Sequence, residues 1–100
     1  MKKYLLKITP KANEDFKDIL HYTLSEYGEL QMQKYADKIW NSFQSIKSQP
    51  FLGKQALIKG KGHFIHFVGK HTIFYDVNLD ESSITIIRIL HQKMNFIKHL

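Results

Sequence analysis

Cysteine is absent from the sequence, which excludes disulfide bonds and thiolate chemistry and fits a reducing compartment. No window approaches the ~18 apolar residues of a membrane-spanning helix. The segment from Met1 to Ile8 has the charge of a signal start, but its apolar run ends at Lys7, short of the roughly 7–15 residues of a secretory core. We therefore expect a cytoplasmic protein without a membrane partner.

Catalytic motifs are missing as well. The sequence has no G-x-S-x-G nucleophile motif, no P-loop and no dinucleotide-binding glycine pattern. Asp15 and Asp18 stand three residues apart in an amphipathic stretch, and we interpret them as solvated charges. The residues alone therefore indicate no reaction type.

Six histidines raise the question of a metal site. Zinc requires three or four convergent ligands. His63 and His66 fall on opposite faces of a predicted strand, so only a cross-strand arrangement of His66, His71 and His91 would form such a site. We interpret these histidines as ordinary strand and surface residues, and predict no metal and no cofactor.

Composition predicts one domain with a basic surface. The chain has 100 residues, 43% of them apolar or aromatic, which suffices for one hydrophobic core and not for two. We therefore expect a single domain over residues 1–100. Lysine and arginine number 15 against 9 acidic residues, a formal net charge of +6. This charge favours nucleic acid, an anionic membrane or an acidic protein as a partner, and does not choose among them.

Two helices are predicted after a first strand at residues 4–8. Thr9 and Pro10 form a helix start, and Gly28 is a typical helix end. A second helix is expected from about Glu29 to Ser48, because Pro50 stops it. The predicted buried stripes are Ala12, Phe16, Ile19, Leu20, Thr23 and Tyr27 in the first helix, and Met32, Tyr35, Ala36, Ile39, Trp40, Phe43 and Ile46 in the second.

Beyond the helices the apolar pattern changes to a period of two. It predicts strands at 63–68, 71–77 and 83–90, leaves open a short strand at 55–58, and ends in one or two helical turns at 94–100. The expected order is β-α-α-β-β-β with a short helical tail. Hairpin-linked strands predict an antiparallel sheet with the helical hairpin on one face, an α+β fold.

Arg88 is the most informative single residue, because it stands in a strand of apolar side chains. Alternation predicts that it shares a face with Ile84, Ile86 and Leu90. An unpaired guanidinium in an apolar setting costs several kcal/mol. Two interpretations remain open: a structural ion pair or strand end at solvent, and a cation held by a rigid sheet at a partner or phosphate site.

A candidate basic patch surrounds the glycine-rich loop at 51–62 and the hairpin after it. Its members are Lys54, Lys59, Lys61 and Lys70. A solvated face is the simplest interpretation. Contact with phosphates or with an acidic protein is the alternative.

Several segments, taken in order, resemble the ParE toxins of the larger ParE/RelE group. The first helix carries A-x-x-D-F-x-x-I-x-x-Y-T from Ala12 to Thr23, and P-x-x-G-K follows the second helix at 50–54. Tyr27-Gly28, Tyr35, Ile39 and the strand at 71–77 also fit. Most specific is residues 86–95, I-I-R-I-L-H-Q-K-M-N, which is similar to the family's closing signature of arginine, two apolar residues, histidine, a short basic stretch and Met-Asp.

The resemblance implies a toxin of a type II toxin–antitoxin system that poisons DNA gyrase by stabilising the complex in which DNA is cut and covalently held. It also implies a ParD-like antitoxin whose C-terminal segment wraps the toxin. Such a poison acts by binding one state of its target and needs no chemistry of its own. The candidate target-binding residues are Arg88, His91, Gln92, Lys93, Met94 and Asn95.

The alternative within the same group is a RelE-like toxin that cleaves messenger RNA on the ribosome. Arg88, His91 and Lys93 would then be catalytic. Against it, residues 64–68 contain no lysine or arginine, and no tyrosine follows Tyr75. A plain nucleic-acid-binding module ranks third, because the sequence lacks interleaved aromatic and basic residues.

Two positions depart from the ParE pattern. The strand at 63–68 lacks the arginine that many members carry there, so no role of that residue transfers to this chain. Asn95 stands where the family has aspartate, a change that bears on a local cap or contact.

Overall fold

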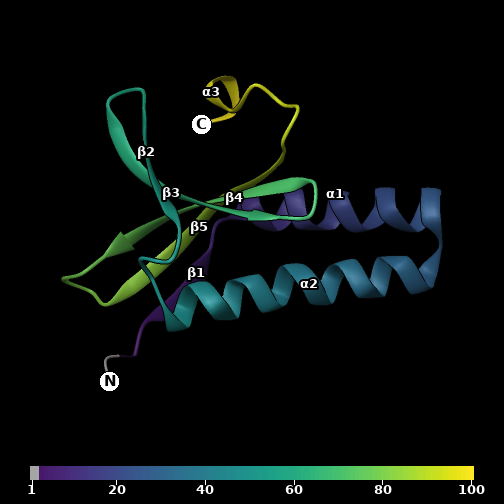
Figure 1. Cartoon of the computed structure of the whole chain (residues 1–100), viewed down its shortest axis with the longest axis horizontal. Helices are drawn as coiled ribbons and strands as arrows, with labels where there is room; N and C mark the ends of the chain where they lie inside the picture. Colours follow the sequence, from purple (N-terminus) through teal and green to yellow (C-terminus); the bar gives the residue numbers. More distant parts are fainter. Residues whose placement is uncertain (1–2) are drawn as a thin grey trace.

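The computed structural model describes residues 3–100, so Met1 and Lys2 of the signal-like start lie outside the described residues. Two long helices lie against one face of a five-stranded sheet, and the chain ends in a short helix beside the sheet (Figure 1). The elements are β1 (Leu5–Ile8), α1 (Pro10–Tyr27), α2 (Glu29–Ser48), β2 (Lys54–Ile58), β3 (Lys61–Val68), β4 (His71–Asn78), β5 (Ser83–His91) and α3 (Phe96–His99). The α+β class is confirmed, and the strand left open at 55–58 is present as β2.

The helical hairpin forms as predicted. The Thr9 hydroxyl accepts a hydrogen bond from the Ala12 N–H, with Pro10 in the first turn. Gly28 separates the two helices at φ +89°, a left-handed conformation that glycine adopts without strain. α2 ends at Ser48, and its C-cap residue Gln49 stands directly before Pro50. Among the described residues, no helix is both long and apolar enough to cross a membrane.

The sheet is mixed, and the prediction of a purely antiparallel sheet is wrong. Its order is β1-β5-β4-β3-β2, with antiparallel neighbours except for β1, which runs parallel to β5. β1 pairs with β5, far away in the sequence, instead of with β2, its neighbour in the sequence, and a pairing between such distant segments leaves no local pattern in the sequence. As a result β5, between β1 and β4, is a central strand.

Two apolar clusters stabilise the sheet, one on each face. The larger joins helix residues such as Ile39 and Phe43 to Ile73, Tyr75 and Ile86. The smaller, on the other face, consists of Ile58, Phe74 and Leu90, with Ala56, Ile65, Ile87 and Leu100 packed against it. Burying the helices' apolar side chains supplies most of the free energy that holds them on the sheet.

Two side chains of the predicted helix stripes are exposed. Tyr27 is 62% exposed because it is the last residue of α1, where the hairpin extends past the sheet (Figure 1). Trp40 is 48% exposed and contacts Phe43 edge to face at the flank of α2. The predicted burial of these two residues is wrong, since helical spacing does not tell where the sheet beneath the helix ends.

Candidate functional site

Arg88 forms a two-pronged ion pair with Asp15 of α1. Arg88 Nε donates to Asp15 Oδ2 at 2.7 Å, and its NH2 donates to Oδ1 at 2.9 Å. The two side chains are only 14% and 12% exposed. Hydrogen bonding to the Asp15 carboxylate raises the pKa of Arg88, so Arg88 stays charged at every physiological pH. The interpretation of Asp15 as a solvated charge is therefore wrong.

Asp15 also completes the edge of β5. β1 pairs with β5 only as far as Ile86, so later N–H groups on that edge have no strand neighbour. Asp15 Oδ2 accepts a hydrogen bond from the Ile89 N–H at 3.0 Å. One carboxylate thus satisfies a guanidinium and a backbone donor, each of which would be costly to leave unpaired when buried.

A β-bulge in β5 changes the face of the sheet on which Arg88 lies. Phe74 pairs with Arg88 but Tyr75 pairs with Ile86, so the register skips Ile87. Beyond the bulge the alternation is shifted by one residue: Ile86 and Ile89 belong to the larger cluster and Leu90 to the smaller. The prediction that Arg88 shares one face with Ile84, Ile86 and Leu90 is wrong for this reason.

The C-terminal segment after β5 is held at three points. The Gln92 N–H donates to the Lys70 carbonyl at 2.9 Å. The Phe96 ring lies against Phe74, with ring centroids 5.5 Å apart. Arg88 NH1 donates to the His99 carbonyl at 2.9 Å, so the same guanidinium joins α1, β5 and α3.

The candidate target-binding residues follow β5 in this anchored segment. Gln92, Lys93, Met94 and Asn95 are exposed, and His91 is half-buried. The Asn95 side chain caps α3 by accepting a hydrogen bond from the Ile97 N–H at 3.2 Å. Asparagine thus provides a cap at the position where the family has aspartate. The segment presents exposed side chains on a fixed backbone.

The lysines of the candidate basic patch lie in two places. Lys59 and Lys61 flank the turn between β2 and β3, and Lys54 begins β2. Lys70 lies in the turn between β3 and β4, at the opposite end of β3. Eight residues of strand, roughly 26 Å, separate these turns. The structure therefore brings Lys59 and Lys61 together at one turn, and places Lys54 opposite Ile65 and Lys70 at the other turn.

The histidines pair with different partners. His63 Nδ1 lies 2.6 Å from Asp76 Oδ1, and His71 contacts His91 edge to face across β4 and β5. His66 stands opposite Ile73 in the β3–β4 pairing. Within residues 3–100, no group of three or more metal-ligating side chains is close enough to hold an ion.

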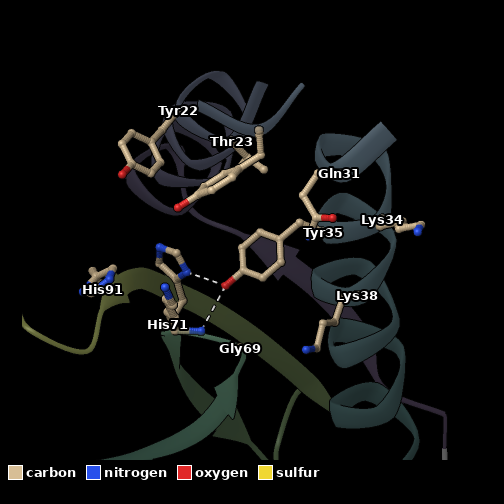
Figure 2. Close-up of a pocket in the computed structure, with 11 residues that line it drawn as sticks. Tyr22, Thr23, Gln31, Lys34, Tyr35, Lys38, Gly69, His71 and His91 are labelled. Carbon is tan, nitrogen blue, oxygen red and sulfur yellow. Dashed lines mark hydrogen bonds between the residues drawn. The ribbon is translucent and has the colours of Figure 1, made fainter. Parts of the chain in front are cut away.

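A cleft of about 800 Å³ opens between the helical hairpin and the β3–β4 turn (Figure 2). We call it the tyrosine–lysine cleft. Its lining consists of Tyr22, Thr23, Tyr27, Gln31, Lys34, Tyr35, Lys38, Gly69, Lys70, His71 and His91. The sequence singled out Lys70, His71 and His91 for other reasons, but did not reveal that they share a cleft, because the lining comes from four separate segments.

Tyr35 and His71 form the floor of the cleft. Tyr35 Oη lies 2.5 Å from His71 Nδ1 and accepts a hydrogen bond from the Lys70 N–H at 3.3 Å (Figure 2). Burial, and secondarily the neighbouring His91, lowers the pKa of His71 from 6.5 to about 4. His71 is therefore neutral at pH 7. In that state the ring carries one proton, and Nδ1 shares a hydrogen bond with the Tyr35 hydroxyl, which also lies 3.3 Å from the Val68 carbonyl oxygen.

The low pKa of His71 predicts that stability falls as the pH drops from 6.5 toward 4. In that window the unfolded chain binds a proton on His71 and the folded chain does not, so unfolding is favoured. After allowance for the half-exposed ring, we expect the free energy of unfolding to fall by about 1 kcal/mol more between pH 7.5 and 5 in the native protein than in His71→Asn. Urea denaturation at both pH values measures it. His21→Asn, at an exposed position of α1, serves as control, and equal pH dependence in all three proteins would contradict the prediction.

The family model and a similar protein point to the same family. The family model described as "ParE toxin of type II toxin-antitoxin system, parDE" matches residues 6–96. Toxin ParE1 of Caulobacter vibrioides is 31% identical over 100 residues, covering 100% of this chain and 99% of that protein. The matched range includes the helical hairpin, the Arg88–Asp15 pair and the segment through Asn95.

Two solved structures share the fold. A chain of the chromosomal ParDE toxin–antitoxin system from P. aeruginosa superposes with a TM-score of 0.75 at 19% identity, covering 89% of this chain and 96% of that one. A chain of the archaeal RelE–RelB complex from Pyrococcus horikoshii OT3 gives a TM-score of 0.65 at 13% identity, covering 92% and 98%. At these identities the likeness concerns the fold alone.

Proposed function

This chain belongs to the ParE toxin family of type II toxin–antitoxin systems, and we propose that it acts by poisoning DNA gyrase and is neutralised by a ParD-like antitoxin. The observation that carries the proposal is the family match over residues 6–96, which includes the whole segment from Arg88 to Asn95. Action by binding suits this architecture. A poison only has to bind the gyrase–DNA complex with cut DNA more tightly than the other states.

The contact surface in this proposal is the segment from His91 to Asn95, in which Gln92, Lys93, Met94 and Asn95 are exposed. Arg88 acts on it as a positioning residue, because its guanidinium is bonded to Asp15 and to the His99 carbonyl. The anchored backbone keeps Gln92, Lys93 and Met94 in one arrangement. A pre-arranged surface loses less conformational entropy on binding than a free tail would.

The same bonding counts against the RelE-like nuclease. A ribonuclease needs free cations to stabilise the charge that develops on the phosphate. The charge of Arg88 is already balanced by the Asp15 carboxylate at 2.7 Å. Of the three residues that would form a nuclease site, only His91 and Lys93 remain available to act on a phosphate.

The antitoxin proposal is supported by charge and by an apolar groove. The sheet face away from the helices has a groove of about 230 Å³, lined mainly by apolar side chains and including Phe67 and Phe96, which are 54% and 42% exposed. The net charge of +6 attracts an acidic segment, and burial of the groove would supply affinity. The similar Pseudomonas and Pyrococcus chains come from systems with an antitoxin.

The direct test is a gyrase cleavage assay. Purified protein, gyrase, ATP and supercoiled plasmid are incubated and then denatured, and linear DNA is measured. We expect linear DNA to accumulate with the native protein and to fall roughly tenfold with Lys93→Glu, about 1.4 kcal/mol of lost binding. Lys11→Glu, the same charge change on an exposed residue of α1, should keep full activity.

Two outcomes would contradict the proposal. One is the absence of linear DNA at a molar excess of toxin over gyrase. The other is cleavage of ribosome-bound messages by the pure protein with gyrase unaffected, which would favour the nuclease. A matched in vitro translation reaction with labelled messenger RNA provides that second measurement.

A further inference from the structure

The tyrosine–lysine cleft combines exposed aromatic rings with positive charge. Tyr22 and Tyr27, from the last turns of α1, are each 62% exposed. Lys34 and Lys38 come from α2 and Lys70 from the β3–β4 turn, and no aspartate or glutamate is among the described residues that line the cleft. Neither the gyrase proposal nor the antitoxin proposal uses these side chains.

The rings and the cations face a shared space. Figure 2 shows Tyr22 on one side, with Tyr35 and His71 opposite it. Lys38 extends from α2 toward Gly69, whereas Lys34 points outward at the rim (Figure 2). The volume, about 800 Å³, lies within the range of roughly 300–1,000 Å³ that is usual for small-ligand sites.

The floor of the cleft is polar. Tyr35 Oη lies 2.5 Å from His71 Nδ1, and the Lys70 N–H donates to the same hydroxyl oxygen at 3.3 Å. The cleft therefore offers ammonium groups beside flat rings, above a floor of hydrogen-bonding side chains.

We propose that the tyrosine–lysine cleft binds a single nucleic-acid strand with unpaired bases. Lys38 and Lys70 contact phosphate oxygens, and a base stacks on Tyr22 or Tyr27. Flat aromatic rings beside a positively charged groove are the arrangement by which proteins hold single strands without sequence preference. The site does not depend on the gyrase proposal and stands if that proposal fails.

An acidic polypeptide is the competing occupant. Carboxylates would suit the lysines, but an amphipathic partner also needs an apolar surface to bury. That surface lies on the other face of the sheet, in the groove that includes Phe67 and Phe96. Two exposed tyrosines above a polar floor suit stacked bases better than aliphatic side chains.

The test is fluorescence anisotropy of the purified protein with labelled twelve-nucleotide strands, poly-dT and poly-rU, over a series of salt concentrations. Binding of either strand supports the site, and the strand that binds more tightly shows whether the natural ligand is DNA or RNA. For Lys38→Gln/Lys70→Gln we expect roughly tenfold weaker binding and a salt slope lowered by about 1.4, since each phosphate contact contributes about 0.7. For Tyr22→Ala/Tyr27→Ala we expect roughly tenfold weaker binding with an unchanged slope.

The matched control is Lys59→Gln/Lys61→Gln, which removes the same charge at the far end of β3 and should change affinity less than twofold. Circular dichroism confirms that each variant is folded. An equal loss of affinity in both lysine variants would mean that binding depends only on the overall positive charge, and would overturn the proposal. So would cleft variants that keep strand binding and lose only antitoxin binding, which would assign the cleft to a protein partner.

Discussion

Replacing Asp15 with alanine is expected to lower the free energy of unfolding by about 3 kcal/mol, because it leaves a buried guanidinium without its counter-charge. The loss also removes the acceptor of the Ile89 N–H, which has no strand neighbour on that edge. For a domain of this size the change corresponds to a drop in Tm of more than about 10 °C. Thermal and urea denaturation followed by circular dichroism measure both quantities.

The control for this variant stands one turn away. Asp18 is exposed on the same helix, and Asp18→Ala should change the free energy of unfolding by less than about 0.5 kcal/mol. Asp15→Ala/Arg88→Met should be more stable than Asp15→Ala, because methionine needs no counter-charge. A double variant no more stable than the single one would mean that the ion pair is not the source of the loss. Arg88→Ala cannot serve alone as a test of target contact, since it removes the anchor of the C-terminal segment.

Replacing Gly53 with alanine is the second change with a large expected effect. A Cβ atom at this position would lie 2.5 Å from the Ile65 carbonyl oxygen and 2.6 Å from Tyr75 Oη. Tyr75 is fully buried, and its hydroxyl accepts a hydrogen bond from the Gly53 N–H and donates one to the Pro50 carbonyl, both at 2.9 Å. The methyl group would force these groups apart, at a cost of about 3 kcal/mol in the free energy of unfolding.

Gly62→Ala provides the comparison. A Cβ at Gly62 meets no other atom within 4 Å, and its φ is not in the left-handed region. We expect Gly62→Ala to be neutral or slightly stabilising, since alanine restricts the unfolded chain. If urea denaturation gave the two variants equal stability, close approach at Gly53 would not explain why the loop after α2 needs glycine there.

Local signals predicted the elements of this fold well. Thr9, Pro10, Gly28 and Pro50 mark the ends of the two helices through chemistry that acts within a few residues. The change of period after residue 62 likewise predicted the hairpin strands. These properties depend on neighbours in the chain, so a single sequence contains them.

Properties that depend on distant segments were not predictable in the same way. The role of Asp15 depends on where β1 stops pairing with β5 and on a bulge at Ile87. Without that geometry, nothing distinguishes Asp15 from Asp18. The tyrosine–lysine cleft is a similar case, because Tyr22, Lys38, Lys70 and His71 come together only after the hairpin has packed on the sheet.

The position of β5 affects the order in which the protein folds during synthesis. The last strand to leave the ribosome lies between β1, from the start of the chain, and β4. Until β5 emerges, β1 lacks its partner in the sheet and α1 lacks the strand on which it packs. The sheet is therefore completed only after β5 has been translated, and pairing across so many residues is slow compared with local helix formation. A newly made copy thus passes through an incomplete, aggregation-prone stage in which co-translational capture by another protein would protect it.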